Sequence, residues 1–433
     1  MDYFKNPRTQ KYCLISIIRI EFMKNLLFLP ILFLSAVTAC TQQKSIETTP
    51  QGAYYTGQYH NYFSEVLGVS QNEVDERMNQ LWEHFFTPGD FSKFAEDDQT
   101  TVYYEPDDST AFIYDTGSND VRTEGMSYGM MICLQLDKPE QFGRLWRWAK
   151  TYMQYDSTSP WEGYFCWQCH ADGEKFGHSN ASDGELYFAT ALFMAAHRWN
   201  NPAYEVDAQE ILDKCMSKDG TQGVWNLYDE ATRVITFVPT DDARLYTDPS
   251  YQLPAFLQLW SQWDKSRQDF WREAADSARQ QLCIASHPVT GLYPDYSTYH
   301  GEPFRGPYCG YDSRRFQYDA IRCAMNVGMD YNLFGSDSDR QIELMTRLLT
   351  FFKNDNFTYG QFELDGSAPT GNYTEGMAGA NAVGSLALKD KDLQKIYIQN
   401  LWNVIPPTGQ WRYYTGMVYM LSMLHVSGNF RIY

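Results

Sequence analysis

Residues 185–199, ELYFATALFMAAHRW, are apolar on nearly every side of a helix and are rich in small side chains. A helix with this pattern is buried on all sides. Residues 269–282, DFWREAADSARQQL, instead place apolar residues on one face and charges on the other, which is typical of a helix that covers a core. The fold class is predicted from the order in which these two kinds of helix follow each other.

The two kinds of helix alternate along the chain. If each buried helix is joined to the next amphipathic one by a hairpin connection, the result is an all-α fold, a closed double ring with six inner and six outer helices. A curved helical-repeat solenoid is the alternative, but no fixed repeat of about 33–47 residues is present. Periodicity predicts the twelve helices near 72–87, 124–137, 139–155, 183–199, 203–217, 252–264, 268–286, 318–333, 337–353, 374–388, 390–402 and 412–426.

The amino terminus has the features of an export signal. From Met23 the chain reads MKNLLFLPILFLSAVTAC, with a positive residue, a short apolar stretch and small residues before Cys40. This ending resembles a bacterial lipoprotein signal, in which the cysteine is lipidated; an ordinary signal peptide with a chance cysteine is the alternative. Residues 1–22 are interpreted as an upstream start-site artefact. We therefore expect an exported protein of the bacterial cell envelope that touches the membrane only through a lipid on Cys40.

The remaining chain reads as one domain. Residues 41–52 form a polar tether, and no linker or low-complexity run interrupts 53–433, so we predict a single catalytic domain there. The net charge of −19 and the lack of a Lys/Arg cluster argue against nucleic-acid binding. Aromatic residues make up 16% of the chain, more than a core normally requires, so some should line a surface.

One cysteine spacing requires a comment. Cys166, Cys169 and His170 fit the C-x-x-C-H pattern of covalent haem attachment. A single match in a long chain is weak evidence, and a local disulfide or two free thiols is the favoured interpretation. We expect no cofactor.

The inner helices share a polar or aromatic residue at their start. These residues are Glu124, Asp183, Tyr251, Asp319, Glu375 and the pair Trp411–Arg412. In a closed ring the inner helices all begin at the same end, so these side chains would meet in one cleft. Helix capping is the alternative for each carboxylate taken singly. Carboxylates beside aromatic rings suit a sugar polymer, because sugar CH faces stack on rings and two carboxyl groups can break a glycosidic bond. Trp161 and Trp167, shortly before Asp183, are candidate stacking platforms.

Four motifs resemble glycoside hydrolase family 8, a family of inverting enzymes on an (α/α)6 barrel. They are TEGMSYGMM (123–131), ASDGELYFATALFMAAHRW (181–199), DPSYQLPAF (248–256) and YDAIR (318–322), and the resemblance extends over 53–433. It implies that Glu124 is the catalytic acid, Asp319 the base that activates water, and Asp183 the residue that binds and distorts the sugar. It also implies that Tyr251 and Arg322 position the water and the base.

Elementary chemistry is consistent with these roles. An inverting enzyme needs one protonated and one ionised carboxyl group. Burial against aromatic residues such as Tyr128 would raise the pKa of Glu124, and Arg322, one helical turn after Asp319, would keep that group charged. This mechanism requires no metal.

The expected substrate is a xylo-oligosaccharide or xylan, bound by a monomer. Residues 115–137 are similar to the xylan-active branch of the family, which includes enzymes that release xylose from the reducing end. In those enzymes a loop before the tenth helix carries a histidine, and residues 365–377 contain none, so endo and exo action both remain open. Glucan or chitosan cleavage, a polysaccharide lyase, and a non-catalytic glycan-binding lipoprotein are the alternatives.

Overall fold

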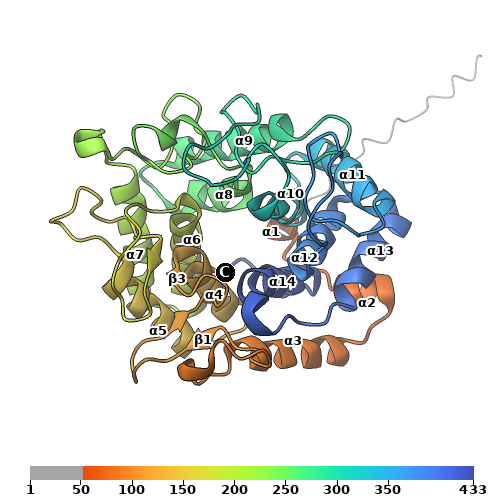
Figure 1. The fold of residues 1–433 in the computed structure, drawn as a ribbon, viewed down its shortest axis with the longest axis horizontal. Helices are drawn as coiled ribbons and strands as arrows, with labels where there is room; N and C mark the ends of the chain where they lie inside the picture. Colours follow the sequence, from red (N-terminus) through yellow and green to blue (C-terminus); the bar gives the residue numbers. More distant parts are fainter. Residues whose placement is uncertain (1–51) are drawn as a thin grey trace, which may run out of the picture. The chain divides into compact units, whose positions relative to one another are not determined.

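Two concentric rings of helices make up the part of the chain that the computed structural model describes, residues 52–433 (Figure 1). The inner ring contains α4 (Thr123–Gln135), α6 (Ser182–Arg198), α8 (Pro254–Trp263), α10 (Arg322–Leu333), α12 (Glu375–Gly384) and α14 (Arg412–Val426). The outer ring contains α3 (Gln71–Phe86), α5 (Pro139–Trp148), α7 (Pro202–Cys215), α9 (Gln268–Ala285), α11 (Ser338–Asn354) and α13 (Lys391–Trp402).

The inner ring is closed, because α14 packs against α4 as well as against α12. The predicted all-α (α/α)6 barrel is therefore confirmed. All twelve predicted helices are present with ends that shift by a few residues, and residues 52–433 lie in one compact unit. Two short helices before the ring, α1 (Ala53–Thr56) and α2 (Tyr62–Leu67), were not predicted, because single turns carry too little periodicity to be seen in a sequence.

Short strands and turns complete the structure at the ends of the helices. Strand β1 (Tyr103–Tyr104) pairs antiparallel with β2 (Phe112–Ile113), and β3 (Val121–Arg122) pairs antiparallel with β4 (Gln168–Cys169). The short helical turns are η1 (Phe91–Lys93), η2 (Ala149–Met153), η3 (Thr221–Gly223), η4 (Ala243–Leu245), η5 (Pro249–Tyr251), η6 (Tyr318–Ile321), η7 (Ser385–Ala387) and η8 (Gly409–Trp411).

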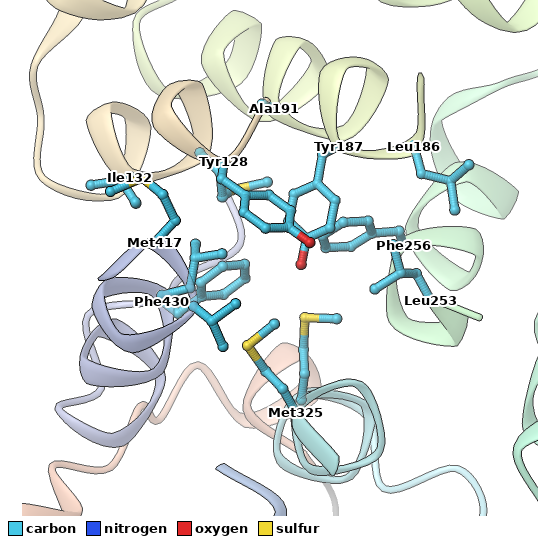
Figure 2. Close-up of a cluster of buried hydrophobic side chains, with 14 of the residues drawn as sticks. Tyr128, Ile132, Leu186, Tyr187, Ala191, Leu253, Phe256, Met325, Met417 and Phe430 are labelled. Atoms are coloured by element: carbon cyan, nitrogen blue, oxygen red, sulfur yellow. The ribbon is translucent and has the colours of Figure 1, made fainter. Parts of the chain in front are cut away.

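Aromatic and sulfur-containing side chains fill the centre of the inner ring. Figure 2 shows Tyr128, Tyr187, Phe256, Met325 and Met417 pointing toward one another from different inner helices. The rings of Tyr128 and Tyr187 lie 4.6 Å apart, and that of Phe256 lies 4.8 Å from Tyr187, both edge to face, an arrangement that favours aromatic pairs beyond the area they bury. The axis of the barrel is thus a packed core below the polar end.

Small residues let the inner helices approach one another closely. A Cβ added at Gly328 of α10 would lie 2.1 Å from the carbonyl oxygen of Val383 in α12, and one at Gly379 of α12 would lie 2.7 Å from Oγ of Ser422 in α14. Real atoms cannot approach so closely, so the glycines set the spacing of the ring. This explains why the buried helices are rich in Gly, Ala and Ser.

The cysteines of the C-x-x-C-H pattern are buried thiols. Cys166 and Cys169 are both fully buried, and the His170 ring stacks on Phe176 at 4.3 Å. Both cysteines are free thiols in the structure, which is one of the two arrangements that the sequence favoured. Within residues 52–433 no three His, Cys, Asp or Glu side chains gather in a way that could hold a metal ion.

The predicted signal, the lipidated Cys40 and residues 41–51 of the tether lie outside the described residues. Among residues 52–433 there is no helix that is both long and apolar enough to cross a bilayer.

We predict that Gly328→Ala lowers the free energy of unfolding by about 1–3 kcal/mol, because the added methyl group must push α10 away from α12. Chemical denaturation followed by circular dichroism measures this change. Gly310→Ala is the matched control, since a Cβ at Gly310 meets nothing within 4 Å. Equal stability of the two variants would contradict the packing argument.

Candidate active site

One buried guanidinium, that of Arg322, binds side chains from the inner helices α4 and α6 and from the turn η6. Its Nη1 donates to Oε2 of Glu124 at 3.0 Å, to Oδ2 of Asp183 at 2.8 Å and to the hydroxyl of Tyr128 at 2.7 Å. Its Nη2 lies 3.3 Å from Oδ1 of Asp319. The two carboxyl groups predicted to be acid and base, 195 residues apart in sequence, therefore contact one side chain.

The local structure explains why these residues meet. Glu124 and Asp183 are each the second residue of an inner helix, and Asp319 lies in the turn η6 that leads into α10. The β3–β4 pair fixes the start of α4, where the Thr123 amide donates to the carbonyl of Trp167 at 3.1 Å. These starts lie at the same end of the ring, as the sequence pattern predicted.

A cleft of about 620 Å³ opens above Arg322, a size typical of a small-molecule site. Of the predicted residues, Glu124, Asp183, Asp319, Tyr251, Trp167 and Trp411 line it. Four further aromatic residues also line it: Tyr311, Tyr318, Tyr413 and Tyr414. The cleft therefore combines carboxyl groups with several rings.

Burial controls the protonation of the carboxyl groups. Burial is the main reason that the pKa of Glu124 is raised to about 8; Arg322 opposes this shift, and Asp319 and Asp183 add to it. Burial also raises the pKa of Asp183, again opposed by Arg322. Glu124 is thus mainly protonated at neutral pH, and burial is the cause, as expected from the sequence.

Two of the predicted residues have distinct surroundings. Oδ2 of Asp183 binds Arg322, whereas its Oδ1 is buried and accepts no hydrogen bond from any residue in 52–433. The ring of Tyr251 lies 5.6 Å from the Arg322 guanidinium and stacks on Phe237. Both side chains therefore offer polar atoms to a ligand in the cleft.

The structure adds a partner for Glu124 that sequence reasoning missed. The hydroxyl of Tyr413 donates to Oε1 of Glu124 at 3.0 Å. A Cβ at Gly125 would lie 2.6 Å from that hydroxyl oxygen, so only glycine leaves room for this contact. Tyr413 follows the pair Trp411–Arg412 that the sequence pattern singled out, and the aromatic run there was the available signal.

Two buried aspartates near Asp319 were also missed. Oδ1 of Asp248 accepts the Ser250 amide at 2.7 Å, and Oδ1 of Asp295 accepts the Ala320 amide at 3.2 Å. Burial raises the pKa of both well above the ordinary range. The sequence Asp-Pro-Ser at 248–250 is a recognisable capping signal, but Asp295 lies in a loop and carries none.

Some predicted residues lie elsewhere. Trp161 is wrong as a cleft platform: it packs beside Tyr155 and Tyr164, 6.2 and 5.6 Å away, and does not line the cleft. Its turn lies on the α7 side, where Gly163 contacts Lys214.

Three other expectations also need correction. Tyr128 is 1% exposed and lies beneath the cleft, where it orients Arg322 instead of facing a sugar. Glu375 begins α12 but does not line the cleft. Arg412 is fully buried and donates to the carbonyls of Thr101 and Gly409. It therefore links α14 to the loops that precede it, and does not face the cleft.

Comparison with known proteins agrees with this geometry. The sequence model described as glycosyl hydrolases family 8 matches residues 108–428. The chain belongs to glycosyl hydrolase family 8. One relative, the reducing end xylose-releasing exo-oligoxylanase of Halalkalibacterium halodurans, is 37% identical over 400 residues, which cover 90% of this chain and 98% of the relative.

Two solved structures of family 8 are also similar to this chain. Rex8A from Paenibacillus barcinonensis, complexed with xylose, has a TM-score of 0.81 and 37% identity, covering 88% of this chain and 100% of its own. A xylobiose complex from Teredinibacter turnerae has a TM-score of 0.82 and 37% identity, covering 88% and 99%. This family 8 chain is therefore an inverting glycoside hydrolase.

We predict that Arg322→Leu lowers the free energy of unfolding by about 3 kcal/mol or more at neutral pH, because it leaves buried carboxyl groups without their cation. The loss should grow as the pH rises from 5 to 8. Without Arg322 the folded-state pKa values of Glu124 and Asp183 rise further above their unfolded values, so ionisation favours the unfolded chain.

Thermal denaturation at several pH values measures this effect. Arg340→Leu, which removes a surface pair with Asp337, is the control and should change stability little at any pH. A pH-independent difference between wild type and Arg322→Leu would contradict the electrostatic account.

Proposed function

We propose that this hydrolase cleaves β-1,4-linked xylo-oligosaccharides by a two-carboxylate inverting mechanism and releases xylose from their reducing end. The observation that carries the mechanism is the placement of Glu124 and Asp319 on one guanidinium in one cleft. Oε2 of Glu124 lies 3.0 Å from one amino nitrogen of Arg322 and Oδ1 of Asp319 lies 3.3 Å from the other. This arrangement suits an inverting enzyme, in which acid and base lie roughly 6.5–9.5 Å apart with room for a water molecule.

Glu124 is proposed as the general acid. Its pKa of about 8 keeps the proton in place at neutral pH, and the proton passes to the glycosidic oxygen as the bond breaks. Tyr413 and Arg322 hold one carboxyl oxygen each. The acid is therefore oriented before the sugar arrives.

Asp319 is proposed as the general base. Its side chain is 31% exposed, more than those of Glu124 and Asp183, so a water molecule can reach it. It would accept a proton from that water, which attacks the anomeric carbon opposite the leaving group. The Arg322 guanidinium lies 3.3 Å from its carboxyl group.

Asp183 and Tyr251 are proposed to hold the sugar ring at the cleavage point. Asp183 lines the cleft, and its Oδ1, which accepts no hydrogen bond from residues 52–433, is the proposed acceptor for a sugar hydroxyl. Such contacts help to distort the ring toward the transition state. Trp167, partly buried with the Arg122 guanidinium over its ring at 5.4 Å, is proposed as a stacking platform for a further sugar unit.

The xylan preference and the reducing-end mode rest on the relatives. The relative at 37% identity is named for reducing-end xylose release, and the structural relatives hold xylose and xylobiose. The segment 365–377 carries no histidine and does not line the cleft. The proposed recognition of the reducing end therefore uses groups other than the loop histidine expected in similar enzymes.

We also propose the cell envelope as the location, through lipidation of Cys40. The sequence of residues 23–40 is the support for this proposal. A lipid-anchored enzyme at that place would act on oligosaccharide fragments that diffuse to the cell.

Product analysis of xylohexaose hydrolysis tests the function. We expect xylose and xylopentaose as first products, with the newly formed anomeric centre in the α configuration by proton NMR. A ladder of internal products would replace the exo proposal with an endo one, and cleavage of cello-oligosaccharides or chitosan instead would overturn the substrate.

Glu124→Gln and Asp319→Asn should each lower kcat by about a hundredfold or more, since a positioned acid or base contributes roughly that much. Both variants should fold, because the replacements keep the shape of the side chain. Glu375→Gln is the matched control: it also removes a carboxylate at the start of an inner helix, and should retain wild-type kcat. Near-normal turnover in either of the first two variants would remove its assigned role.

We predict that kcat/KM on xylo-oligosaccharides falls as the pH rises through about 8. Glu124 acts in its protonated form, and its pKa of about 8 means that the proton is lost above that pH. A pH–rate profile measures this limb. A decline already centred near pH 5, at the ordinary pKa of a glutamic acid, would contradict the assignment.

A further inference from the structure

The residue before Asp319 has a strained backbone. Tyr318 has a φ angle of +34°, in the left-handed region where a bulky side chain is a genuine outlier. Strain of this kind persists only where the surroundings impose it, and it gathers at functional sites. The contacts around this turn should therefore show what holds it.

Both peptide groups that flank Asp319 are held by side chains from other parts of the chain. The carbonyl of Tyr318, which precedes Asp319, accepts a hydrogen bond from the hydroxyl of Tyr414 in α14 at 3.3 Å. The amide of Ala320, which follows Asp319, is shared between the carbonyl of Gln317 at 2.9 Å and Oδ1 of the buried Asp295 at 3.2 Å. The backbone of Asp319 is thus fixed on both sides.

Arg322 alone leaves the carboxyl group of Asp319 loosely held. The Arg322 nitrogens lie 2.7–3.0 Å from Tyr128, Asp183 and Glu124 but 3.3 Å from Asp319. A base that must direct one water molecule needs tight placement, since an error of about 1 Å can cost about a hundredfold in rate. The direction of its Cα–Cβ bond is therefore decided by the backbone.

We propose that Tyr414 and Asp295 are positioning residues for Asp319, which hold its two peptide groups and maintain the strained Tyr318 so that the carboxyl group faces the cleft. This inference rests on the proposed role of Asp319 as the base. Tyr414 comes from α14, the last inner helix, and Asp295 from the loop between α9 and η6.

Tyr414→Phe tests the first contact, because it removes only the hydroxyl. We expect kcat on xylohexaose to fall by about tenfold to a hundredfold, with a much smaller change in KM. Tyr308→Phe, on an exposed ring of the same loop region, is the control and should leave kcat unchanged. If kcat is unchanged in Tyr414→Phe while Asp319→Asn is inactive, only the positioning role of Tyr414 is overturned. If Asp319→Asn is active, the role of Asp319 as the general base is overturned.

Tyr318→Asn separates positioning from direct contact with the sugar. Asparagine tolerates the left-handed region, so this variant should have a higher Tm than wild type, whereas Tyr308→Asn, at a residue with an ordinary negative φ, should not. In the Tyr318→Asn background, Tyr414→Phe should lower kcat by a clearly smaller factor than in wild type. The reason is that asparagine adopts the left-handed conformation without needing the Tyr414 hydrogen bond to maintain it. Equal losses in both backgrounds would mean that Tyr414 acts directly on substrate, and would overturn the proposal.

Asp295 is tested by a conservative and a disruptive replacement. Asp295→Asn keeps an oxygen acceptor for the Ala320 amide and should retain most of kcat, while Asp295→Leu removes it and should lower kcat with Asp319 still present. If Asp295→Leu does not fold, Asp295→Asn still tests the proposal. If kcat falls as far in Asp295→Asn as in Asp319→Asn, the carboxyl group of Asp295 matters for more than its hydrogen bond to Ala320, and the proposal is overturned.

Discussion

The structure depends on one buried positive charge that several carboxyl groups share. Arg322 is 2% exposed and contacts Glu124, Asp183 and Asp319. A buried guanidinium without partners would be very costly, and so would the buried carboxyl groups of Glu124 and Asp183 without a cation. Burial nevertheless raises the pKa of Glu124 to about 8 against the effect of Arg322. The burial that makes this cation necessary therefore also keeps the catalytic proton on Glu124.

Closure of the helix ring completes the cluster. Glu124 comes from the first inner helix and Tyr413 from the last, and they meet only because α14 packs against α4. Gly125 makes the contact possible, since a Cβ there would collide with the Tyr413 ring. A fold that left the ring open would separate the acid from one of its two partners.

The sequence predicts the helices well and the loops poorly. Helical periodicity extends over ten or more residues, so the inner and outer helices and the polar residues at their starts could be recognised. The strands β3 and β4 have two residues each, too few for a pattern, yet their pairing places Trp167 in the cleft. Trp161, six residues earlier, lies on a different turn, and nothing in the local sequence distinguishes the two tryptophans.

The missed site residues have the same physical explanation. Asp295 is a loop residue whose burial depends on segments distant in sequence, and its role as an acceptor for the Ala320 amide appears only in three dimensions. Tyr413 and Tyr414 lie in a run of aromatic residues that packing alone would explain. Charge and periodicity along one segment carry no information about such long-range contacts.

Several buried polar atoms without partners among residues 52–433 belong to residues at or near the cleft. Oδ1 of Asp183, Oδ2 of Asp248 and Nε of Arg322 are buried without a hydrogen bond from these residues. Each such group costs stability, and the strained Tyr318 adds to that cost. The packed aromatic centre and the closely spaced inner helices compensate for it. The end of the barrel that holds the carboxyl groups is therefore stabilised by the packing of the rest of the ring.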